Sequence, residues 1–331
     1  MPTATPALDP AATSPFPVPA PVPEAPLWFG KADVAARIHP KRARALIEWA
    51  LGSGFDPVQD ANRINTPAGA GHFLLMPSTL GPWSGIKVLS VAPDNPAIGF
   101  PRIQATYVLM DALTLTTRAL MDGSLLTELR TPAVSAVAAD RLAAPDASQL
   151  LVFGTGPQAL AHIEAMAAIR PLRKVTVVGR SPGKVAIALA KATELGLEAV
   201  RGDAAAAADA DIIVCATSAK DPLFDGSQVK DGACVIAMGS HETDRRELDA
   251  GLLGRSLVVV EDTATALREA GDVTLAIAEG TLDGGTLVPL LEIVRGTAVR
   301  RSDAPNVFKS VGMSWQDLAV AIGVVDPGIG S

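Results

Sequence analysis

Residues 150–181, LLVFGTGPQALAHIEAMAAIRPLRKVTVVGRS, decide the fold. An apolar run leads into Gly154, Gly156 and Ala159, which are spaced G-x-G-x-x-A, and a second apolar run at 175–178 closes the unit. The order is strand, glycine turn, helix, strand, over about 30 residues, as in dinucleotide-binding units. Such a turn lets the backbone approach a pyrophosphate, and the helix N-terminus offers it free N–H groups. The stretch predicts a dinucleotide site; a tight βα turn without a ligand is the alternative.

The end of the second strand indicates which dinucleotide is bound. NAD-preferring sites usually carry Asp or Glu there, to bond the ribose hydroxyls. This chain instead has Arg180 and Ser181, with Lys184 one turn later. A guanidinium group is a planar fork of donors that suits a phosphate. We therefore expect NADP(H) to be preferred, with NAD(H) as the second cofactor, unless Arg180 is only a solvated loop residue.

Length and composition limit the class of protein. The chain has 331 residues, of which 48% are apolar, which is enough for two globular domains. Its net charge of −7, without a basic run, argues against a nucleic-acid partner. Cys215 and Cys234 lie in apolar strand-like runs and are expected to be buried thiols. No apolar run approaches the length of about 18 residues that a membrane span needs, and no His, Cys and carboxylate cluster has metal-ligand spacing.

Residues 1–26 differ from the rest of the chain. They contain nine prolines and no Lys or Arg. This composition cannot pack a core, and it lacks the charged start of a signal peptide. We expect a disordered arm and, with few cysteines, a cytoplasmic protein.

The part of the chain before the glycine unit predicts helices and an antiparallel sheet. An apolar face favours a helix over 31–53, and Thr131 before Pro132 is typical of a helix start, with an end near Leu142. Between them, apolar and β-branched runs predict strands at 73–76, 85–92, 104–111 and 115–121. An unpaired edge of this sheet suggests a partner subunit.

The part after the glycine unit alternates between helices and strands. The pattern predicts a helix at 182–195, strands at 211–216, 233–238 and 257–260, and a final amphipathic helix at 315–324. Strands that alternate with helices imply a doubly wound parallel sheet. The fold class is therefore α/β, of the Rossmann type.

Three basic residues of the first part are candidates for binding an anion. Arg63 follows Asn62 in a loop, Lys87 lies inside the strand-like GIKVLSV, and Arg130 precedes the expected helix start. A lysine in so apolar a strand needs an anionic partner or a solvated cleft. Each could pair with an acidic side chain; together they could clamp a small carboxylate. The histidines His39, His72 and His162 are expected to be structural or solvated.

Several segments together resemble the ornithine cyclodeaminase/μ-crystallin family, from about residue 30 to the end. They are FLLMPS, GIKVLSVAPDNPAIGFPRIQA, LMDG, LRTPAVSAVAADRLA, FGTGPQA, DIIVCATSAKDPLF, AMGSHETDRRELD, EAGD and FKSVGMSWQDLA. The resemblance implies a Rossmann domain plus an α+β substrate and dimerisation domain that includes the last helix. We accordingly expect the arm at 1–26, a substrate-binding and dimerisation domain at 27–145, an NAD(P)-binding domain at 146–300, and a returning C-terminal segment at 301–331.

The resemblance also implies roles for individual residues. Arg63, Lys87 and Arg130 would bind the substrate carboxylate, and the protein would be a homodimer. Cofactor contacts would come from Thr131, Gly154, Thr155, Gly156, Pro157, Gln158, Arg180, Ser181, Lys184, Ala216, Thr217, Ser218, Met238, Gly239, Ser240, Lys309 and Val311.

Within the family, CATSAKDPLFDG and GSHETDRRELD are most similar to bacterial Δ1-pyrroline-2-carboxylate (ketimine) reductases. Ornithine cyclodeaminases carry Asp at the positions of His241 and Arg180. We therefore expect NAD(P)H-dependent reduction of Δ1-pyrroline-2-carboxylate, or of Δ1-piperideine-2-carboxylate, to L-proline or L-pipecolate. The candidate catalytic residues are Lys87, Arg130 and His241, although His241 could equally be a loop residue. The alternatives are an alanine-type amino-acid dehydrogenase, an ornithine cyclodeaminase and a non-catalytic small-ligand binding protein.

Overall fold

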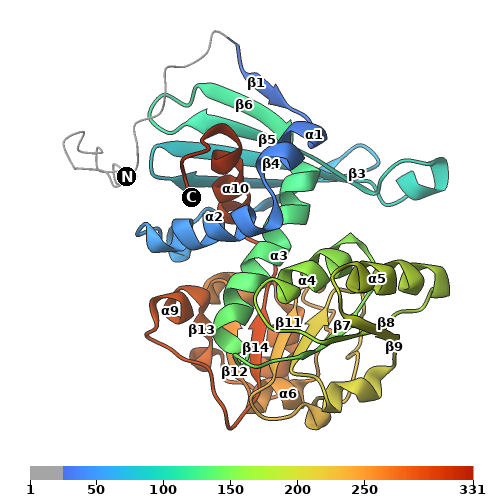
Figure 1. Ribbon diagram of the computed structural model, residues 1–331. Coiled ribbons are helices and arrows are strands. Elements are labelled where there is room, and N and C mark those ends of the chain that lie inside the picture. The colour runs from blue at the N-terminus through green and yellow to red at the C-terminus, as the bar shows by residue number, and fades with distance from the viewer. Residues whose placement is uncertain (1–24, 331) are drawn as a thin grey trace.

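The computed structural model describes residues 25–330, so the arm expected at 1–26 lies almost entirely outside the described residues. Two sheets with their helices form two domains, and α3 (Gly123–Leu142) runs from one into the other (Figure 1). Within the described residues, no helix has both the length and the apolar character to cross a membrane.

The first domain is built on a six-stranded sheet in the order β1-β6-β5-β4-β3-β2. Neighbouring strands are antiparallel, except that β1 pairs parallel to β6. The strands are β1 (Leu27–Phe29), β2 (Ile64–Ala68), β3 (Gly71–Leu80), β4 (Trp83–Val91), β5 (Ile103–Asp111) and β6 (Thr117–Asp122). The predicted strands are all present, and each is longer or shorter by a few residues at its ends.

The helix expected over 31–53 is in fact two helices, α1 (Lys31–Arg37) and α2 (Pro40–Gly52). Proline disfavours helical backbone in the residue before it, and His39 is extended there. The ring of His39 accepts a hydrogen bond from the backbone N–H of Arg42, which caps the second helix.

The helix start predicted at Thr131 and Pro132 is wrong. Helix α3 begins nine residues earlier, and the carboxylate of Asp122 caps it by accepting the N–H of Leu125 at 2.7 Å. Pro132 lies inside the helix, where it removes one hydrogen bond. Burial of the helix between both domains outweighs that loss, and Arg130 consequently lies on a helix interior rather than before its start.

The second domain contains the predicted doubly wound parallel sheet. Its eight strands are ordered β13-β12-β14-β11-β10-β7-β8-β9. They are β7 (Gln149–Phe153), β8 (Lys174–Val178), β9 (Glu198–Arg201), β10 (Ile212–Cys215), β11 (Cys234–Ala237), β12 (Leu257–Val260), β13 (Val288–Pro289) and β14 (Asn306–Lys309). Strand order reverses between β7 and β10, and such switch points are where Rossmann folds bind dinucleotides.

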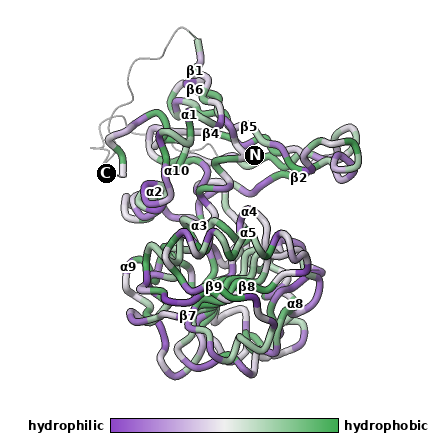
Figure 2. Tube along the Cα trace, turned by 45° about the vertical axis from the view of Figure 1, so that its right-hand side comes forward, coloured by the Kyte–Doolittle hydropathy of each residue, from purple (hydrophilic) through white to green (hydrophobic). Residues whose placement is uncertain are grey.

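Helices cover both faces of this sheet. They are α4 (Pro157–Ala167), α5 (Pro182–Glu194), α6 (Ala250–Arg255), α7 (Thr263–Glu269), α8 (Gly271–Ala278) and α9 (Leu290–Arg295). Single 3-10 turns occupy Pro57–Gln59, Asn95–Ile98, Ala204–Ala208, Gly226–Gln228 and Gly284–Thr286. The central strands are largely apolar (green in Figure 2), and Cys215 and Cys234 are buried in them, as predicted.

The chain returns to the first domain later than residue 301. Strand β14, all four residues of which are buried, fills the place between β11 and β12 in the second sheet. Only after it does α10 (Ser314–Val325) cross back, to pack on β3, β4, α2 and α3. Residues 306–309 therefore belong to the second sheet, where β14 is hydrogen-bonded to a neighbour on each side.

Candidate active site

A cleft of about 810 Å³ lies between the two domains. Strands β3 and β4 and helix α3 form one wall, and the turns after β10, β11 and β14 form the other. Those turns are at the carboxyl ends of the parallel strands, where open α/β sheets bind ligands. The cleft brings together the predicted site residues Arg63, Lys87, Arg130, Thr131, Gln158, Ala216, Thr217, Met238, Gly239, His241 and Val311.

The glycine turn after β7 fits a dinucleotide. Gly154 has φ +117°, and a Cβ there would lie 2.4 Å from the carbonyl oxygen of Ala216, so only glycine is accommodated. Gly156 is the N-cap of α4; a Cβ there would meet no atom within 4 Å, and no side chain caps the helix. The first helical residue, Pro157, has no N–H, so the N–H groups that are open to an anion begin at Gln158, and such groups are what a pyrophosphate site requires.

The residues expected to bind the 2′-phosphate on the adenosine ribose of the cofactor are exposed at the end of β8 and the start of α5. These are Arg180, Ser181 and Lys184. Among residues 25–330, no carboxylate forms an ion pair with Arg180 or Lys184, and the Ser181 hydroxyl does not cap α5. Their donors are thus free for a ligand.

Lys87 has the anionic partner that its apolar strand required. Its Nζ donates to Oδ2 of Asp317 at 2.7 Å and to Oγ1 of Thr127 at 3.1 Å, and both charged side chains are fully buried. Burial lowers the pKa of Lys87 to about 8, an effect that the negative charge of Asp317 opposes and the positive charge of Arg130 adds to. Lys87 is also among the residues that line the cleft, which places it next to a bound ligand.

Arg130 shares Asp317 with Lys87. Its Nε lies 3.6 Å from Oδ1 of Asp317, and its Nη1 donates to Oε1 of Gln316 at 2.9 Å. A guanidinium group has five N–H donors. Most of those of Arg130 remain for a ligand.

Arg63 reaches across the cleft to the second domain. It forms an ion pair with Glu269 at the end of α7 and donates to the carbonyl of Val311 at 3.3 Å. Arg63, Lys87 and Arg130 thus share the carboxylates of Glu269 and Asp317, and Glu269 also pairs with Arg268, so positive charges outnumber negative ones in this group. A carboxylate-bearing ligand would reduce this excess.

His241 lines the cleft from the loop after β11. Partial removal from water, followed by the nearby charge of Arg63, lowers its pKa. The imidazole is consequently neutral near pH 7, because its pKa starts from about 6.5. By contrast, His162 is fully buried and bonded to Gln158 and Ser135, which is the structural role expected for it.

Two predicted cofactor residues, Ser240 and Lys309, lie beneath the cleft rather than in its wall. Lys309 Nζ donates to the carbonyl of Ser240 at 2.6 Å and lies 2.8 Å from Oδ2 of Asp272. Both side chains are buried. They support the turns that face the cleft, and the neighbouring Val311 supplies the lining.

Sequence reasoning missed the acidic residues that hold the site. Asp317 is one, and its signal was a carboxylate within the apolar final helix. Glu247 is another: its Oε1 accepts the N–H of Thr217 at 2.8 Å, and its Oε2 accepts the N–H of Gly239 at 2.7 Å. It therefore ties together the turns after β10 and β11. No group of three or more potential metal ligands is found within the described residues.

Comparisons with known proteins agree with this geometry. The family model described as ornithine cyclodeaminase/mu-crystallin family matches residues 31–328. A Δ1-pyrroline-2-carboxylate reductase of Colwellia psychrerythraea is 34% identical over 262 residues, which cover 77% of this chain and 83% of the relative. A Δ1-pyrroline-2-carboxylate/Δ1-piperideine-2-carboxylate reductase of Azospirillum brasilense is 33% identical over 298 residues, 88% of this chain and 92% of the relative.

A solved structure extends the likeness to three dimensions. The Thermococcus litoralis Δ1-pyrroline-2-carboxylate reductase, in complex with NADH and L-proline, superposes with a TM-score of 0.82 at 29% identity. The match covers 92% of this chain and 99% of that one.

Proposed function

The chain belongs to the ornithine cyclodeaminase/mu-crystallin family, and from this premise we propose that it reduces a cyclic ketimine carboxylate with a nicotinamide cofactor. The substrate is Δ1-pyrroline-2-carboxylate or its six-membered homologue, and the product is L-proline or L-pipecolate. One observation carries the proposal. Three cations suited to a carboxylate and the turns suited to a dinucleotide line the same cleft.

Lys87, Arg130 and Arg63 bind the substrate carboxylate. This contact fixes the ring so that the adjacent imine carbon faces the nucleotide domain. Positioning of this kind contributes much of the rate in a reaction between two bound partners. A bound nicotinamide would supply the hydride that forms the new C–H bond, and the C=N π pair would become the lone pair of the amine nitrogen.

His241 accepts a hydrogen bond from the imine nitrogen in this proposal. A protonated imine is an N–H donor, and a neutral imidazole nitrogen is a suitable acceptor. The lowered pKa of His241 keeps it neutral near pH 7, so it does not repel the cationic imine.

The cleft wall favours a reductase over a cyclodeaminase. Leu74, Met76 and Leu89 line it with apolar surface, which suits the methylene groups of a ring. Of the described lining residues, the carboxylates are Glu242 and Glu269, and each is paired with an arginine. A diamine substrate such as ornithine would bring a second ammonium group, for which no unpaired carboxylate is present in this wall.

We further propose NADP(H) as the preferred cofactor. The support is the exposed group Arg180, Ser181 and Lys184, which has no acidic partner in the described part of the chain. A 2′-phosphate would accept charge-assisted hydrogen bonds from it.

The protein is proposed to act as a homodimer. Helices α3 and α10 pack on one face of the first sheet. The other face presents half-buried apolar side chains, among them Leu75, Ile86, Val88 and Val108. Contiguous apolar surface of this kind marks an interaction site, and a second copy of the same face would cover it.

A panel of substrates tests the proposed function. We expect NADPH oxidation with Δ1-pyrroline-2-carboxylate and Δ1-piperideine-2-carboxylate, and much less with pyruvate plus ammonia. Ammonia release from L-ornithine with NAD+ should be negligible. Faster turnover of pyruvate with ammonia would indicate an alanine-type dehydrogenase, and tight binding of the imines without turnover would indicate a binding protein.

A further inference from the structure

Glu261 connects the turn 310–312 on one side of the cleft with Arg130 on the other, through Gln316. It lies at the end of β12 and is 2% exposed. Its Oε2 accepts the N–H groups of Val311 and Gly312, at 2.8 and 2.9 Å. Its Oε1 accepts from Oγ of Ser310 at 2.9 Å and from Nε2 of Gln316 at 2.5 Å. One buried carboxylate therefore holds the whole turn 310–312, which faces the cleft.

Gln316 continues this connection into the first domain. It is fully buried on α10, and its Oε1 accepts the hydrogen bond from Nη1 of Arg130. The turn also touches Arg130 directly: Gly312 has φ +81°, and a Cβ there would lie 2.6 Å from Nη1 of Arg130. The turn, Glu261, Gln316 and the guanidinium group form a closed, buried set of contacts.

The direction of each hydrogen bond in this set is fixed by chemistry. Arginine can only donate, so the amide oxygen of Gln316 must face it. The amide nitrogen of Gln316 must then donate to Glu261, which as a carboxylate accepts from every neighbour. No member can be reversed without placing two donors or two acceptors together.

We propose that Glu261 and Gln316 are positioning residues that form a strut between the cofactor-facing turn 310–312 and Arg130. The inference rests on the proposed function, in which this turn faces the cofactor and Arg130 binds the carboxylate. A cofactor that contacts the turn also favours the bound position of Arg130 through the strut, so cofactor and carboxylate bind more tightly together than alone. The two binding events are coupled reciprocally.

The test measures this coupling with pyrrole-2-carboxylate, a planar ring carboxylate that cannot be reduced by hydride. Its Kd is determined with and without NADPH. In the unmodified protein we expect NADPH to lower the Kd by about tenfold, within the range of coupled sites. In Glu261→Gln, the new amide NH2 group must face either the N–H groups of Val311 and Gly312 or the amide nitrogen of Gln316, so two donors always meet. The decrease in Kd that NADPH causes should therefore shrink to about twofold or less.

A reciprocal exchange provides the rescue. In the double variant Glu261→Gln/Gln316→Glu, the amide at 261 donates to the carboxylate at 316, which still accepts from Arg130. The coupling should return to at least about fivefold, close to that of the unmodified protein. If Glu261→Gln proves too unstable to assay, Gln316→Met interrupts the same strut at similar side-chain length and should lose the coupling as well.

Asp211→Asn is the matched control. Asp211 Oδ2 also accepts two backbone N–H groups, of Ser148 at 2.7 Å and Gln149 at 2.9 Å, but at the amino ends of the parallel strands, away from the cleft. This variant should lose stability and keep the coupling. The proposal is overturned if the unmodified protein shows no coupling, if Glu261→Gln retains it, if the folded double variant does not regain it, or if Asp211→Asn loses it equally. Intact coupling without imine turnover would instead contradict the proposed reductase function and leave the strut standing.

Discussion

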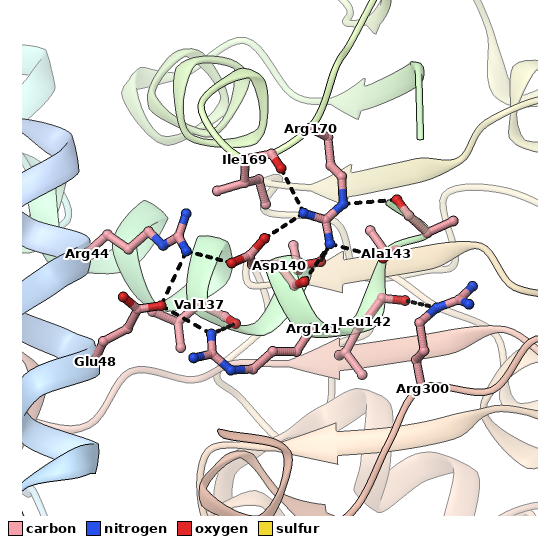
Figure 3. A network of polar contacts seen from close by, with 12 residues as sticks. Arg44, Glu48, Val137, Asp140, Arg141, Leu142, Ala143, Ile169, Arg170 and Arg300 are labelled. Carbon is pink, nitrogen blue, oxygen red and sulfur yellow. Dashed lines mark hydrogen bonds and ion pairs between the residues drawn. The ribbon is translucent and has the colours of Figure 1, made fainter. Parts of the chain in front are cut away.

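Arg130 in the middle of α3 and Arg170 beside its C-terminal end are both largely buried, and their guanidinium groups are bonded very differently. Arg170 donates to the carbonyls of Ala139, Asp140, Ala143 and Ala144 and pairs with the carboxylate of Asp140 at 2.5 Å. Figure 3 shows it among Arg44, Glu48, Arg141 and Arg300, which bond the same end of the helix. The last carbonyls of a helix have no partner within it, and Arg170 supplies one.

Arg130 has one close hydrogen bond, to Gln316, and a longer ion pair with Asp317. It lines the cleft, whereas Arg170 is enclosed by the chain. The difference teaches how to tell the two uses of a buried arginine apart. Donors matched by the chain indicate a structural role, and donors left over beside a cleft indicate a ligand.

Removal of Arg130 should produce the largest effect on activity. Arg130→Ala takes one partner from a desolvated charged contact, and kcat/KM for the imine should fall by the equivalent of about 2–5 kcal/mol. Asp317 keeps Lys87 as its partner while Gln316 loses its donor, so the melting temperature should fall by less than in a variant that lacks Arg170. Steady-state kinetics and thermal unfolding check both parts; near-normal kinetics would return Arg130 to a structural role.

The corresponding change at the other end of the helix should act on stability. Arg170→Ala leaves several helix carbonyls without their donor, and the free energy of unfolding should fall by about 2–4 kcal/mol. Activity per folded molecule should be unchanged. As a control, Arg301→Ala removes a fully exposed pair with Asp303 and should alter neither stability nor activity measurably. An Arg170→Ala protein that is stable but inactive would reverse the comparison.

An exposed arginine provides an intermediate case. Arg180 has free donors but lies in solvent, so its contact with a 2′-phosphate should contribute less than the buried clamp. Arg180→Asp should lower the preference for NADPH over NADH by about tenfold, the lower end for a charge-assisted contact. Arg295→Asp, which changes an exposed arginine at the end of α9, should leave the ratio unchanged. Preference for NADH in the unmodified protein would contradict the assignment.

A pH dependence is expected from Lys87 rather than from either arginine. The pKa of Lys87 is lowered to about 8, so its ammonium is charged below that pH and neutral above it. Affinity for pyrrole-2-carboxylate, whose ring nitrogen does not titrate in this range, should be constant below pH 8 and weaken by up to about tenfold per unit above it. Lys87→Arg should move this decline to higher pH, because a guanidinium remains protonated. A flat profile to pH 10 in the unmodified protein would show that Lys87 does not bind the carboxylate as a cation.

The parts of the molecule that the sequence predicted are those set by local chemistry. The glycine turn at 154–156 needs its backbone geometry whatever surrounds it, and it was correctly placed. The position of Lys87 in an apolar strand predicted that it has an anionic partner. The partner, Asp317, is 230 residues away and could not be identified from the sequence. Pro132 was predicted to start a helix because proline favours the first helical position. The burial of α3 between the two domains instead keeps this proline inside the helix. Glu261 gave no local signal, because its role depends on a turn and a helix that only the fold brings to it.

The most direct test of the central claim is the stoichiometry of a single reaction. Δ1-pyrroline-2-carboxylate is incubated with the protein and excess NADPH, and NADPH loss and L-proline formation are measured together. The account predicts one molecule of L-proline for each NADPH oxidised, and a rate that is strongly reduced in Arg130→Ala but kept in Arg170→Ala per folded molecule. Absence of L-proline in the presence of folded, NADPH-binding protein, or equal rates in the two variants, would contradict it.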